Sequence, residues 1–541
     1  MSKGQTRDLV LEESIASTHP LTHRQIQIAL SGLMLGLLLA ALDQTIVATA
    51  LPTIVGDLGG FTHLSWVVTA YLLTSTVVTP LYGKLSDLYG RKMLFQFAIV
   101  VFIVGSALAG LSQNIYQLVA FRALQGIGGG GLFAMVFSII GDIVPPRERG
   151  KYQGYFGAVF AGASVLGPLA GGFLTDQISW RWIFYVNLPV GILALFVTSV
   201  VLKLPVKHIK HRIDYAGSVL ISAAVTAILL VTVWGGQTYA WTSPSILLLV
   251  LLAVILTAGF IYREFKTPDP ILPLRLFRNR VFSIASGIGF LAGFSLFGAV
   301  IFLPEYMQIV RGVSPTKSGL MLIPFTLGIV FASVGSGQVI SRIGRYKVFP
   351  VIGTFMLAVG FFLLSLFRIH TSYFVESLYM IVGGVGLGFS MQVIILATQN
   401  AVEFKDMGTA TSAVTFFRTM GGAIGTSFFG NILVNRVDYN LGKLMPHGAS
   451  ISKSSVLSSI SGTPAQLDKL PVLVHSIIVD SFVRSLHVVF LWAIPFAALA
   501  FILSIFLPEH PLRSVAIVGS SVDEHGESLS EIASGGSAMM E

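Results

Sequence analysis

The chain contains no cysteine and few charged residues. The absence of cysteine from its 541 residues excludes disulfide bonds, thiolate metal sites and cysteine nucleophiles. Charged side chains make up 11% of the sequence, against about 25% in a typical soluble domain. Hydrophobic residues reach 54%, and lipid is the surrounding that accepts so much apolar surface. The composition therefore indicates a polytopic membrane protein.

Sequence signatures of catalysis are missing as well. No P-loop, no H-E-x-x-H and no Ser-His-Asp arrangement is apparent, so we expect neither an enzyme nor an ATP-driven pump. We also expect no cofactor and no bound metal. Residues 1–25 are polar and lack a short apolar core followed by a small-residue cleavage site, so we predict no signal peptide.

Long apolar runs dominate the remainder. A helix needs about 20 apolar residues to cross a bilayer. The sequence contains fourteen candidate runs, and those at 214–235 and 245–263 are the weakest. Without these two the count is twelve, and both termini stay on one side. The runs lie at 26–51, 64–83, 93–111, 115–141, 152–175, 183–202, 214–235, 245–263, 282–306, 318–340, 348–367, 373–400, 408–434 and 485–507.

Basic residues are distributed asymmetrically around these runs. With the N-terminus inside the cell, inner segments hold 23 of the 34 Lys and Arg residues, and outer loops hold 9. Because positive charge in short loops marks the cytoplasmic side, we expect both termini in the cytoplasm. We also predict a long polar outer loop at 435–483, with a short helix or hairpin at 465–475. Residues 508–541 are rich in Gly, Ser and Glu and are predicted to be a disordered tail.

Two patterns recur in the two halves of the chain. GKLSDLYGRK at 83–92 returns as GQVISRIGRYK at 337–347, and GIGGG at 126–130 returns as GVGLG at 384–388. The starts of these pairs are separated by 254 and 258 residues, so the two halves keep register. Weak internal symmetry of this kind is typical of secondary transporters.

The repeat predicts how the chain divides into domains. We expect an all-α fold with one six-helix lobe at 26–202 and a second at 282–507. Residues 203–281 then form a linker that carries the two extra transmembrane helices.

Four motifs and the repeat together resemble the major facilitator superfamily, and within it the fourteen-helix drug/proton antiporter family. The motifs are Leu42-Asp43-Gln44-Thr45-Ile46-Val47 with Leu51-Pro52, the loop at 83–92, Arg122-Ala-Leu-Gln-Gly126-Ile-Gly-Gly-Gly-Gly131, and Gly154 with Ala163, Gly167-Pro168 and Gly171-Gly172. The string Trp180-Arg-Trp-Ile-Phe-Tyr-Val-Asn187-Leu-Pro189 adds to the resemblance. It implies a major facilitator fold and proton-driven export.

Asp43 and Arg122 lie within otherwise apolar runs. Because a charge inside a bilayer costs a few kcal/mol or more, such residues face a cavity or a partner. Each lies about 8 residues, or roughly 12 Å, from the outer end of its run. We therefore predict an electrostatically coupled pair in a central cavity, in which Asp43 carries the proton and faces cationic substrates. Alternatively, Asp43 caps a backbone group, and Arg122 binds backbone carbonyls.

The loop at 83–92 places charges beside glycines at helix ends. Its arginine and lysine anchor the cytoplasmic side, and in the family this loop latches the outward-open state. The second copy has Ser341 in place of the acid, so we predict that the charge latch belongs to the first lobe alone. The latch residues are Gly83, Asp87, Gly90, Arg91 and Lys92.

The glycines of 122–131 contain G-x-G-x-x-G, but no strand precedes them, so we expect helix packing and no dinucleotide site. The antiporter motif of the family has glycine at position 163, where this chain has alanine. In the family this motif distinguishes exporters from importers. Its residues here are Gly154, Gly167, Pro168, Gly171 and Gly172.

Two more charges complete the candidate site. Glu305, at the outer end of the run 282–306, is predicted to be a second acid for protons or cations, or else an interfacial carboxylate. Arg418 lies near the middle of the run 408–434 and has no partner that the sequence can name.

The resemblance predicts a proton-coupled multidrug efflux antiporter, linked to antibiotic resistance, that exports lipophilic and often cationic compounds by alternating access. The expected partners are small molecules, protons and the bilayer of the cell membrane, with no nucleic acid, and the expected state is a monomer. One alternative is an exporter of a specific physiological solute or lipid on the same scaffold. Another is a membrane scaffold or sensor that transports nothing.

Overall fold

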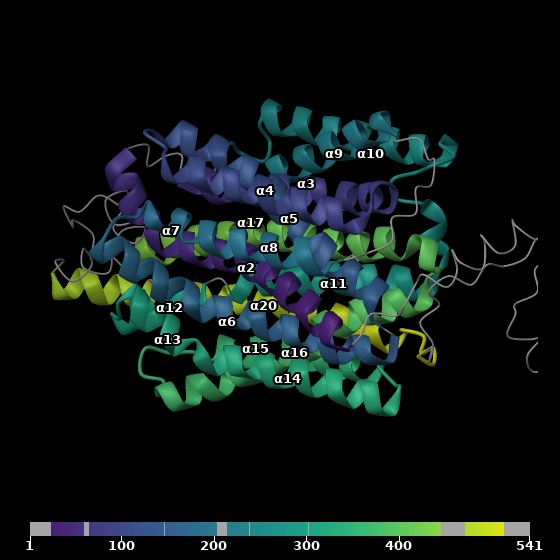
Figure 1. Ribbon diagram of the computed structural model, residues 1–541. Coiled ribbons are helices and arrows are strands. Elements are labelled where there is room, and N and C mark those ends of the chain that lie inside the picture. The colour runs from purple at the N-terminus through teal and green to yellow at the C-terminus, as the bar shows by residue number, and fades with distance from the viewer. Residues whose placement is uncertain are drawn as a thin grey trace, which may run out of the picture.

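The computed structural model describes residues 23–58, 64–144, 146–202, 214–236, 238–300, 302–444 and 471–512. Throughout these residues the chain forms long helices that run side by side in one bundle (Figure 1). The helices are α2 His23–Leu58, α3 Leu64–Tyr89, α4 Arg91–Gly110, α5 Ile115–Ile143, α6 Pro146–Gln177, α7 Trp182–Tyr185, α8 Asn187–Val201, α9 Tyr215–Trp234, α10 Pro244–Lys266, α11 Arg280–Val300, α12 Leu303–Arg311, α13 Pro315–Met321, α14 Ile323–Ile343, α15 Val348–Ser365, α16 Tyr373–Ala401, α17 Met407–Leu444 and α20 Val472–Ile505. Short 3-10 turns at Leu274–Arg278 and Phe404–Asp406 lead into α11 and α17.

The predicted all-α membrane fold is confirmed. In the described part of the chain, eleven helical stretches are long and apolar enough to cross a membrane. The helices α3, α11 and α17 fall outside those eleven but lie in the same bundle, where α17 packs against both α3 and α11. Serine and threonine are frequent in α3 and α17, and α17 is also rich in glycine; such small residues suit helices that pack on protein more than on lipid.

Three of the predicted runs are each divided into two helices. The run 183–202 contains α7 and α8, the run 282–306 ends in the separate α12, and the run 318–340 begins with α13. Proline stands in the first turn of α12 and of α14, at Pro304 and Pro324. Proline has no amide hydrogen to donate to the preceding turn, so it starts a helix more readily than it continues one.

The packing of the helices repeats between the two halves. In the first half α5 packs against α3 and α4, and in the second half α16 packs against α14 and α15. Glycines bring these helices close in both halves: a Cβ on Gly128 would lie 2.5 Å from the Phe102 nitrogen, and one on Gly388 would lie 2.5 Å from the Ile329 oxygen. The extra pair α9 and α10 pack on each other, and α9 also contacts α3 and α17.

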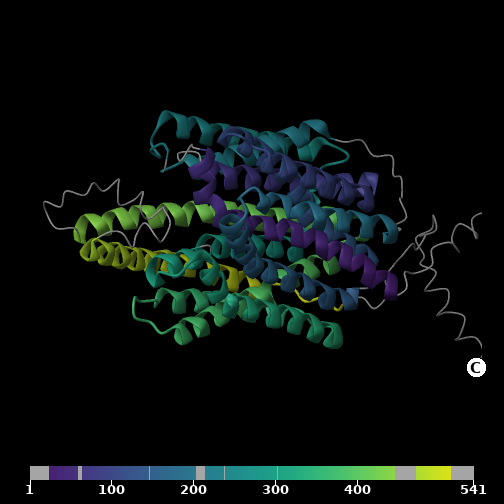
Figure 2. The ribbon, with the colours of Figure 1, turned by 60° about the vertical axis from the view of Figure 1, so that its left-hand side comes forward.

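The prediction of a polar loop over 435–483 is wrong at both ends. The helix α17 continues to Leu444, and α20 begins at Val472. Figure 2 shows the two helices side by side, extending beyond their neighbours. Asn440 Nδ2 donates to Ser485 Oγ over 3.0 Å, and buried apolar residues of both helices share one cluster, so packing stabilises helix where polarity suggested loop. Of the stretch 465–475, residues 465–470 lie outside the described residues.

The predicted disorder of 508–541 is wrong for its first residues. The Glu509 carboxylate accepts from the backbone nitrogen of Tyr346 over 3.2 Å, and Asn400 Nδ2 donates to the His510 carbonyl over 3.2 Å. Leu512 is buried. Residues 508–512 therefore pack on the second lobe, whereas 513–541, like 1–22 at the other terminus, lie outside the described residues.

The extension of α17 and α20 predicts a proximity that chemical cross-linking can measure. Because the chain has no cysteine, Asn440→Cys with Ser485→Cys would introduce only two thiols. A short bismaleimide should link them efficiently, since their side chains are in hydrogen-bond contact. In the control, Asn440→Cys is combined with Ser504→Cys, about 28 Å further along α20. Equal cross-linking of the two pairs would contradict the helical extension.

Candidate functional site

The bundle has two ends, the Gly83 end and the Trp180 end. The Gly83 end holds the turn between α3 and α4, and the Trp180 end holds the turn between α6 and α7. The predicted charged pair lies between these ends, in the first lobe, and the predicted latch lies at the Gly83 end.

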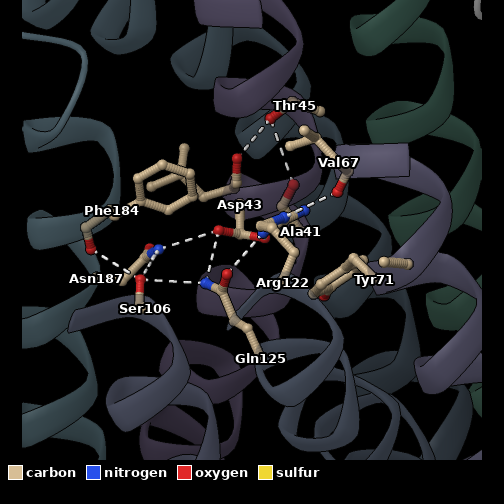
Figure 3. Close-up of polar contacts among 12 residues, drawn as sticks. Ala41, Asp43, Thr45, Val67, Tyr71, Ser106, Arg122, Gln125, Phe184 and Asn187 are labelled. Atoms are coloured by element: carbon tan, nitrogen blue, oxygen red, sulfur yellow. Dashed lines mark hydrogen bonds and ion pairs between the residues drawn. The ribbon is translucent and has the colours of Figure 1, made fainter. Parts of the chain in front are cut away.

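The Asp43 carboxylate is the centre of a buried polar network (Figure 3). Arg122 NH1 lies 2.5 Å from Asp43 Oδ2, and Gln125 Nε2 donates to Oδ1 over 2.8 Å. Asn187 Nδ2 donates to the same Oδ1 over 3.2 Å. Asp43 comes from α2, Arg122 and Gln125 from α5 and Asn187 from α8, so one carboxylate connects three helices.

Ser106 of α4 completes this network. Its hydroxyl accepts from Gln125 over 3.1 Å and from Asn187 over 3.0 Å, and it donates to the Phe184 carbonyl over 2.8 Å. The amide groups that hold Asp43 are thus held in turn by a second shared partner. The arrangement orients each amide so that its NH2 group, and not its oxygen, faces the carboxylate.

The Arg122 guanidinium has further partners on α3. Its Nε donates to the Val67 carbonyl over 3.3 Å, and its Cζ lies 4.4 Å from the centroid of the Tyr71 ring. Its NH1 also donates to Gln125 Oε1 over 2.7 Å. Arg122 therefore pairs with an acid and with a backbone carbonyl at once, and both predicted alternatives for this residue describe part of its surroundings.

Asp43 is closed off in this conformation. Its exposed fraction is 0% and that of Arg122 is 1%, so in the state observed the two charges face each other and no cavity among the described residues reaches them. All donors found for the carboxylate among the described residues are side chains, which is the arrangement of a charge network and not of a backbone cap. A buried pair of this kind makes either partner costly to remove alone.

The predicted latch residues form a second charged network at the Gly83 end. Asp87 and Arg91, one turn apart, pair over 2.6 Å, and Arg91 Nε reaches Asp142 at the end of α5 over 2.8 Å. Thr409, in the first turn of α17, donates to Asp87 Oδ2 over 2.9 Å. Since α17 belongs to the second half of the bundle, the Asp87 carboxylate connects the two halves directly.

The glycines of the latch allow these contacts. Gly90 has φ of 93°, a left-handed conformation that glycine adopts without strain, and it stands immediately before α4. A Cβ on Gly83 would lie 2.6 Å from Ser412 of α17, so glycine is needed where the two halves meet. Lys92 is turned away from this contact and donates to the Ser199 carbonyl of α8.

Other contacts close the Gly83 end further. Gln399 Nε2 of α16 donates to the Phe137 carbonyl of α5 over 2.9 Å, and Gln153 of α6 donates to Gln399 Oε1 over 3.1 Å. A Cβ on Gly150 of α6 would lie 3.2 Å from the Gly337 carbonyl of α14. The two halves are therefore in contact at this end in the state observed.

In the part of the chain that the structure describes, the second copy of the loop touches the first lobe through Gly337 but makes no charged contact with it. Ser341 Oγ donates to the Gln338 carbonyl of its own helix over 3.0 Å, and Arg345 faces Glu509 over 3.4 Å with most of its side chain exposed. The acidic contact between the halves is made by Asp87 in the described part of the chain, and Ser341 has no equivalent contact there.

The glycines of the antiporter motif lie on two sides of α6. On one side Gly167 and Gly171 face α2, where a Cβ on Gly171 would lie 2.8 Å from the Ile46 oxygen. Thr45 Oγ1 donates across this contact to the Ala163 carbonyl over 2.9 Å. This helix contact lies two residues along α2 from Asp43, so α6 supports the helix that carries the acid.

On its other side α6 meets the second lobe. A Cβ on Gly154 would lie 2.6 Å from the Ser333 oxygen of α14, and one on Gly172 would lie 2.6 Å from Thr316 of α13. Pro168 lies inside α6, and a Cβ on Gly319 would lie 2.7 Å from its ring. The motif therefore lies at two helix interfaces. One is between α6 and α2 within the first lobe, and the other is between α6 and the second lobe.

The structure does not bring Glu305 or Arg418 into the Asp43 network. Glu305 lies in the first turn of α12 and is exposed. Arg418, on α17, is half-buried, and its Cζ lies 5.8 Å from the centroid of the Phe137 ring. The four predicted charges thus form one pair and two separate residues.

A second buried acid was missed by the sequence analysis. Glu376 of α16 has an exposed fraction of 0%, pairs with Arg311 over 2.6 Å, and accepts from the Tyr306 hydroxyl over 2.7 Å. It lies near the start of the run 373–400, and the sequence analysis did not single it out. The sequence feature that would have pointed to Glu376 is its partner Arg311, an arginine at the end of α12 in the same lobe.

The network around Asp43 was also found only in part. Gln125 follows Arg122 by three residues and so shares its helix face, a spacing that was visible in the sequence. Asn187 and Ser106 come from distant helices, and only the fold places them at the carboxylate.

Comparison with known proteins decides the family. The model described as Major Facilitator Superfamily matches residues 33–426. The chain belongs to the major facilitator superfamily. An uncharacterised transporter of this type from Mycobacterium tuberculosis is 43% identical over 488 residues, which cover 90% of this chain and 70% of that protein.

Two relatives from Bacillus subtilis carry functional names. Multidrug transporter protein MdtP is 37% identical, with 88% of this chain and 92% of that protein covered, and multidrug resistance protein 3 is 35% identical, with 90% and 96% covered. Among solved structures, that of the proton:xylose symporter XylE matches with a TM-score of 0.59 at 15% identity, over 92% of this chain and 98% of that one. At that identity the likeness concerns the fold, and this chain is a multi-span membrane transporter.

Removing one member of the buried pair should be more harmful than removing both. We expect Arg122→Met to lower the free energy of unfolding by about 3–5 kcal/mol, because it leaves an unpaired buried carboxylate. Adding Asp43→Asn to the same chain should restore part of the loss. Thermal unfolding of the purified protein in detergent measures both effects. Arg181→Met, which breaks a more exposed pair with Asp57, is the control and should cost about 1 kcal/mol or less. Strictly additive losses in the double variant would contradict the pairing.

Loss of the Asp87 contact should open the Gly83 end. In a chain carrying Ser412→Cys, the thiol is buried between the halves and should react slowly with a membrane-impermeant maleimide. Asp87→Asn should speed this reaction, because it weakens charged hydrogen bonds worth about 1.5–3 kcal/mol each. Ser341→Ala, at the equivalent position of the second copy, should leave the rate unchanged. The same rate for Asp87→Asn and for the parent would show that the loop does not hold the halves together.

Proposed function

We propose that this transporter is a proton-coupled multidrug exporter that moves lipophilic, often cationic compounds out of the cell by alternating access. The observation that carries the proposal is the sealed pair of Asp43 and Arg122 in a lobe whose Gly83 end is closed against the second lobe. The names of the Bacillus subtilis relatives and their coverage of nearly the whole chain support the substrate class.

The proposed orientation follows from charge. Basic residues are concentrated in the segments that share the Gly83 end, so this end faces the cytoplasm, and both termini lie there with it. The protein is placed in the cell membrane and works as a monomer without a cofactor. In this orientation the state observed is closed toward the cytoplasm.

Protonation of Asp43 is the proposed coupling step. The neutral acid no longer attracts the Arg122 guanidinium, which keeps Gln125, the Val67 carbonyl and the Tyr71 ring as partners. The two amides that point toward the carboxylate lose a charged acceptor at the same time. Because the network joins α2, α4, α5 and α8, one proton changes the contacts of most helices in the first lobe.

The electrochemical gradient can drive this step. One elementary charge that crosses a potential of 100 mV is worth about 2.3 kcal/mol, comparable with the latch contacts at Asp87. Protonation from outside then weakens the hold on a bound cation, which leaves outward. Glu305, exposed in α12, is the second acid proposed to take part.

One observation favours the alternative of a lipid or other apolar physiological substrate. A hollow of about 590 Å³ opens between α3, α9 and α10, lined by apolar side chains together with Ser218, Ser222 and Thr226. It lies on helices that cross the membrane, so a hydrocarbon chain could enter it from the bilayer. An exporter of lipids would use this hollow, whereas an exporter of cations depends on Asp43.

Transport by purified protein in proteoliposomes tests the proposal. An imposed proton gradient should drive ethidium transport by the parent protein, and Asp43→Asn should reduce the gradient-driven rate by about tenfold or more. Asp480→Asn makes the same chemical change at an exposed helix pair and should transport normally. Retention of gradient-driven transport by Asp43→Asn would remove Asp43 from the coupling step. A response to neutral lipids, with none to cations in the parent, would favour the alternative.

A further inference from the structure

Arg418 is a charged residue deep in the bundle that the coupling network does not use. It lies 11 residues into α17, about 16 Å from the start of that helix at the Gly83 end. Arg418 lines a small hollow within the bundle, whereas its neighbours Phe417 and Met420 pack against a buried apolar cluster. A charged residue inside a membrane protein marks a substrate or ion path by default.

No acid neutralises Arg418 in the part of the chain that the structure describes. Arg122 and Arg311, two other arginines packed among the helices, pair with Asp43 and Glu376 at 2.5 and 2.6 Å. Arg418 makes no ion pair and no hydrogen bond of its guanidinium within the described residues. Its charge is therefore available to a bound ion or substrate.

Glu305 does not fill this role. The backbone of Arg418 touches Gly293 of α11, where a Cβ on the glycine would lie 3.1 Å from the Arg418 carbonyl carbon. Glu305 follows Gly293 by 12 residues, about 18 Å further toward the Trp180 end, beyond the break between α11 and α12. Glu305 and Arg418 are thus at different depths.

The guanidinium lies at the boundary between the lobes. Arg418 belongs to the second lobe, and the Phe137 ring that it approaches belongs to α5 of the first. Contact with an aromatic face uses the flat side of a guanidinium and leaves its in-plane N–H donors free. Those donors match the two oxygens of a carboxylate in a bidentate contact.

The surroundings of Arg418 suit an apolar body attached to such a group. A hollow beside the guanidinium is lined by residues of α11, α16 and α17, which are Gly289, Ala292, Met391, Ile394, Ile395, Val414 and Thr415. The Thr415 hydroxyl already donates to the Thr411 carbonyl over 2.9 Å, so Arg418 is the polar group that remains. The hollow measures about 10 Å³ in this closed state, room for about one water molecule, so a larger guest enters when the lobes separate.

We propose that Arg418 recognises the carboxylate of amphiphilic substrates, so that this transporter accepts organic acids and zwitterions in addition to cations. The inference rests on the proposed export function and names a further substrate class for the same path. A carboxylate bound here neutralises a guanidinium that lies deep in α17 and makes no ion pair among the described residues, and its apolar part fills the hollow. A cation held near Asp43 or Glu305 does not need Arg418.

Binding of a matched pair of compounds tests this assignment. Naphthoate and naphthamide have nearly the same shape, and only the first carries a charge. Calorimetric titration of the full-length protein in detergent should show naphthoate binding about tenfold or more tightly than naphthamide, the ratio expected for a charged hydrogen bond. Arg418→Gln should remove that difference, and Arg418→Lys, which keeps the charge but loses the bidentate geometry, should restore part of it.

Two controls keep the outcomes separate. Arg484→Gln makes the same change at an exposed position that pairs with Asp480, and it should bind both compounds as the parent does. Ethidium binding, measured on the same preparations, should survive Arg418→Gln, which also shows that this variant is folded. Equal binding of naphthoate by Arg418→Gln and by the parent would overturn the carboxylate site. Absence of ethidium binding and transport in the parent would instead overturn the proposed export of cations and leave the assignment of Arg418 to the naphthoate result.

Discussion

The ion pair between Asp43 and Arg122 is the interaction on which the first lobe depends. A carboxylate that is fully buried among membrane helices is stable only while its charge is compensated, and here an arginine and two amides compensate it. The residues of this network come from α2, α4, α5 and α8. Compensating the charge of Asp43 therefore determines how these four helices pack together. Any step that changes the charge of Asp43 must change that meeting too.

Small residues allow the other close contacts between helices, and they determine where the lobes can move past each other. The glycines of α5 let α3 and α4 approach within backbone contact, and those of α6 do the same for α2 and α14. Helices that meet through glycine have little side-chain interdigitation to break when they move. At the Gly83 end, the hydrogen bond from Thr409 to Asp87 adds a directional contact to this glycine-lined interface. That contact stabilises the closed state.

The sequence was sufficient to predict the all-α membrane fold, because apolar runs of bilayer length have few other uses. It was also sufficient to predict the pairing of Asp43 with Arg122, since two opposite charges at one depth in a bilayer stabilise each other. It failed at 435–483, where polar residues lie on the outer face of helices whose inner faces pack together. Ser106 and Glu376 were not singled out, and Asn187 was named only within a motif, because the fold and not the sequence places each of them beside its partners.

Three of the arginines packed among the helices show how one residue type can have different surroundings. Arg122 and Arg311 each balance a buried acid within one lobe, whereas Arg418 has an aromatic ring of the opposite lobe and no acid. The pairs compensate buried charge within the protein, whereas the Arg418 guanidinium has no such compensation among the described residues.

The central claim, that Asp43 is the group that exchanges a proton for a cationic substrate, is tested most directly by proton release. Ethidium is added to purified protein in weakly buffered detergent, and the pH is followed with an indicator dye. Release is predicted from the parent and from Asp480→Asn, and none from Asp43→Asn. The same release from Asp43→Asn as from the parent would contradict the account.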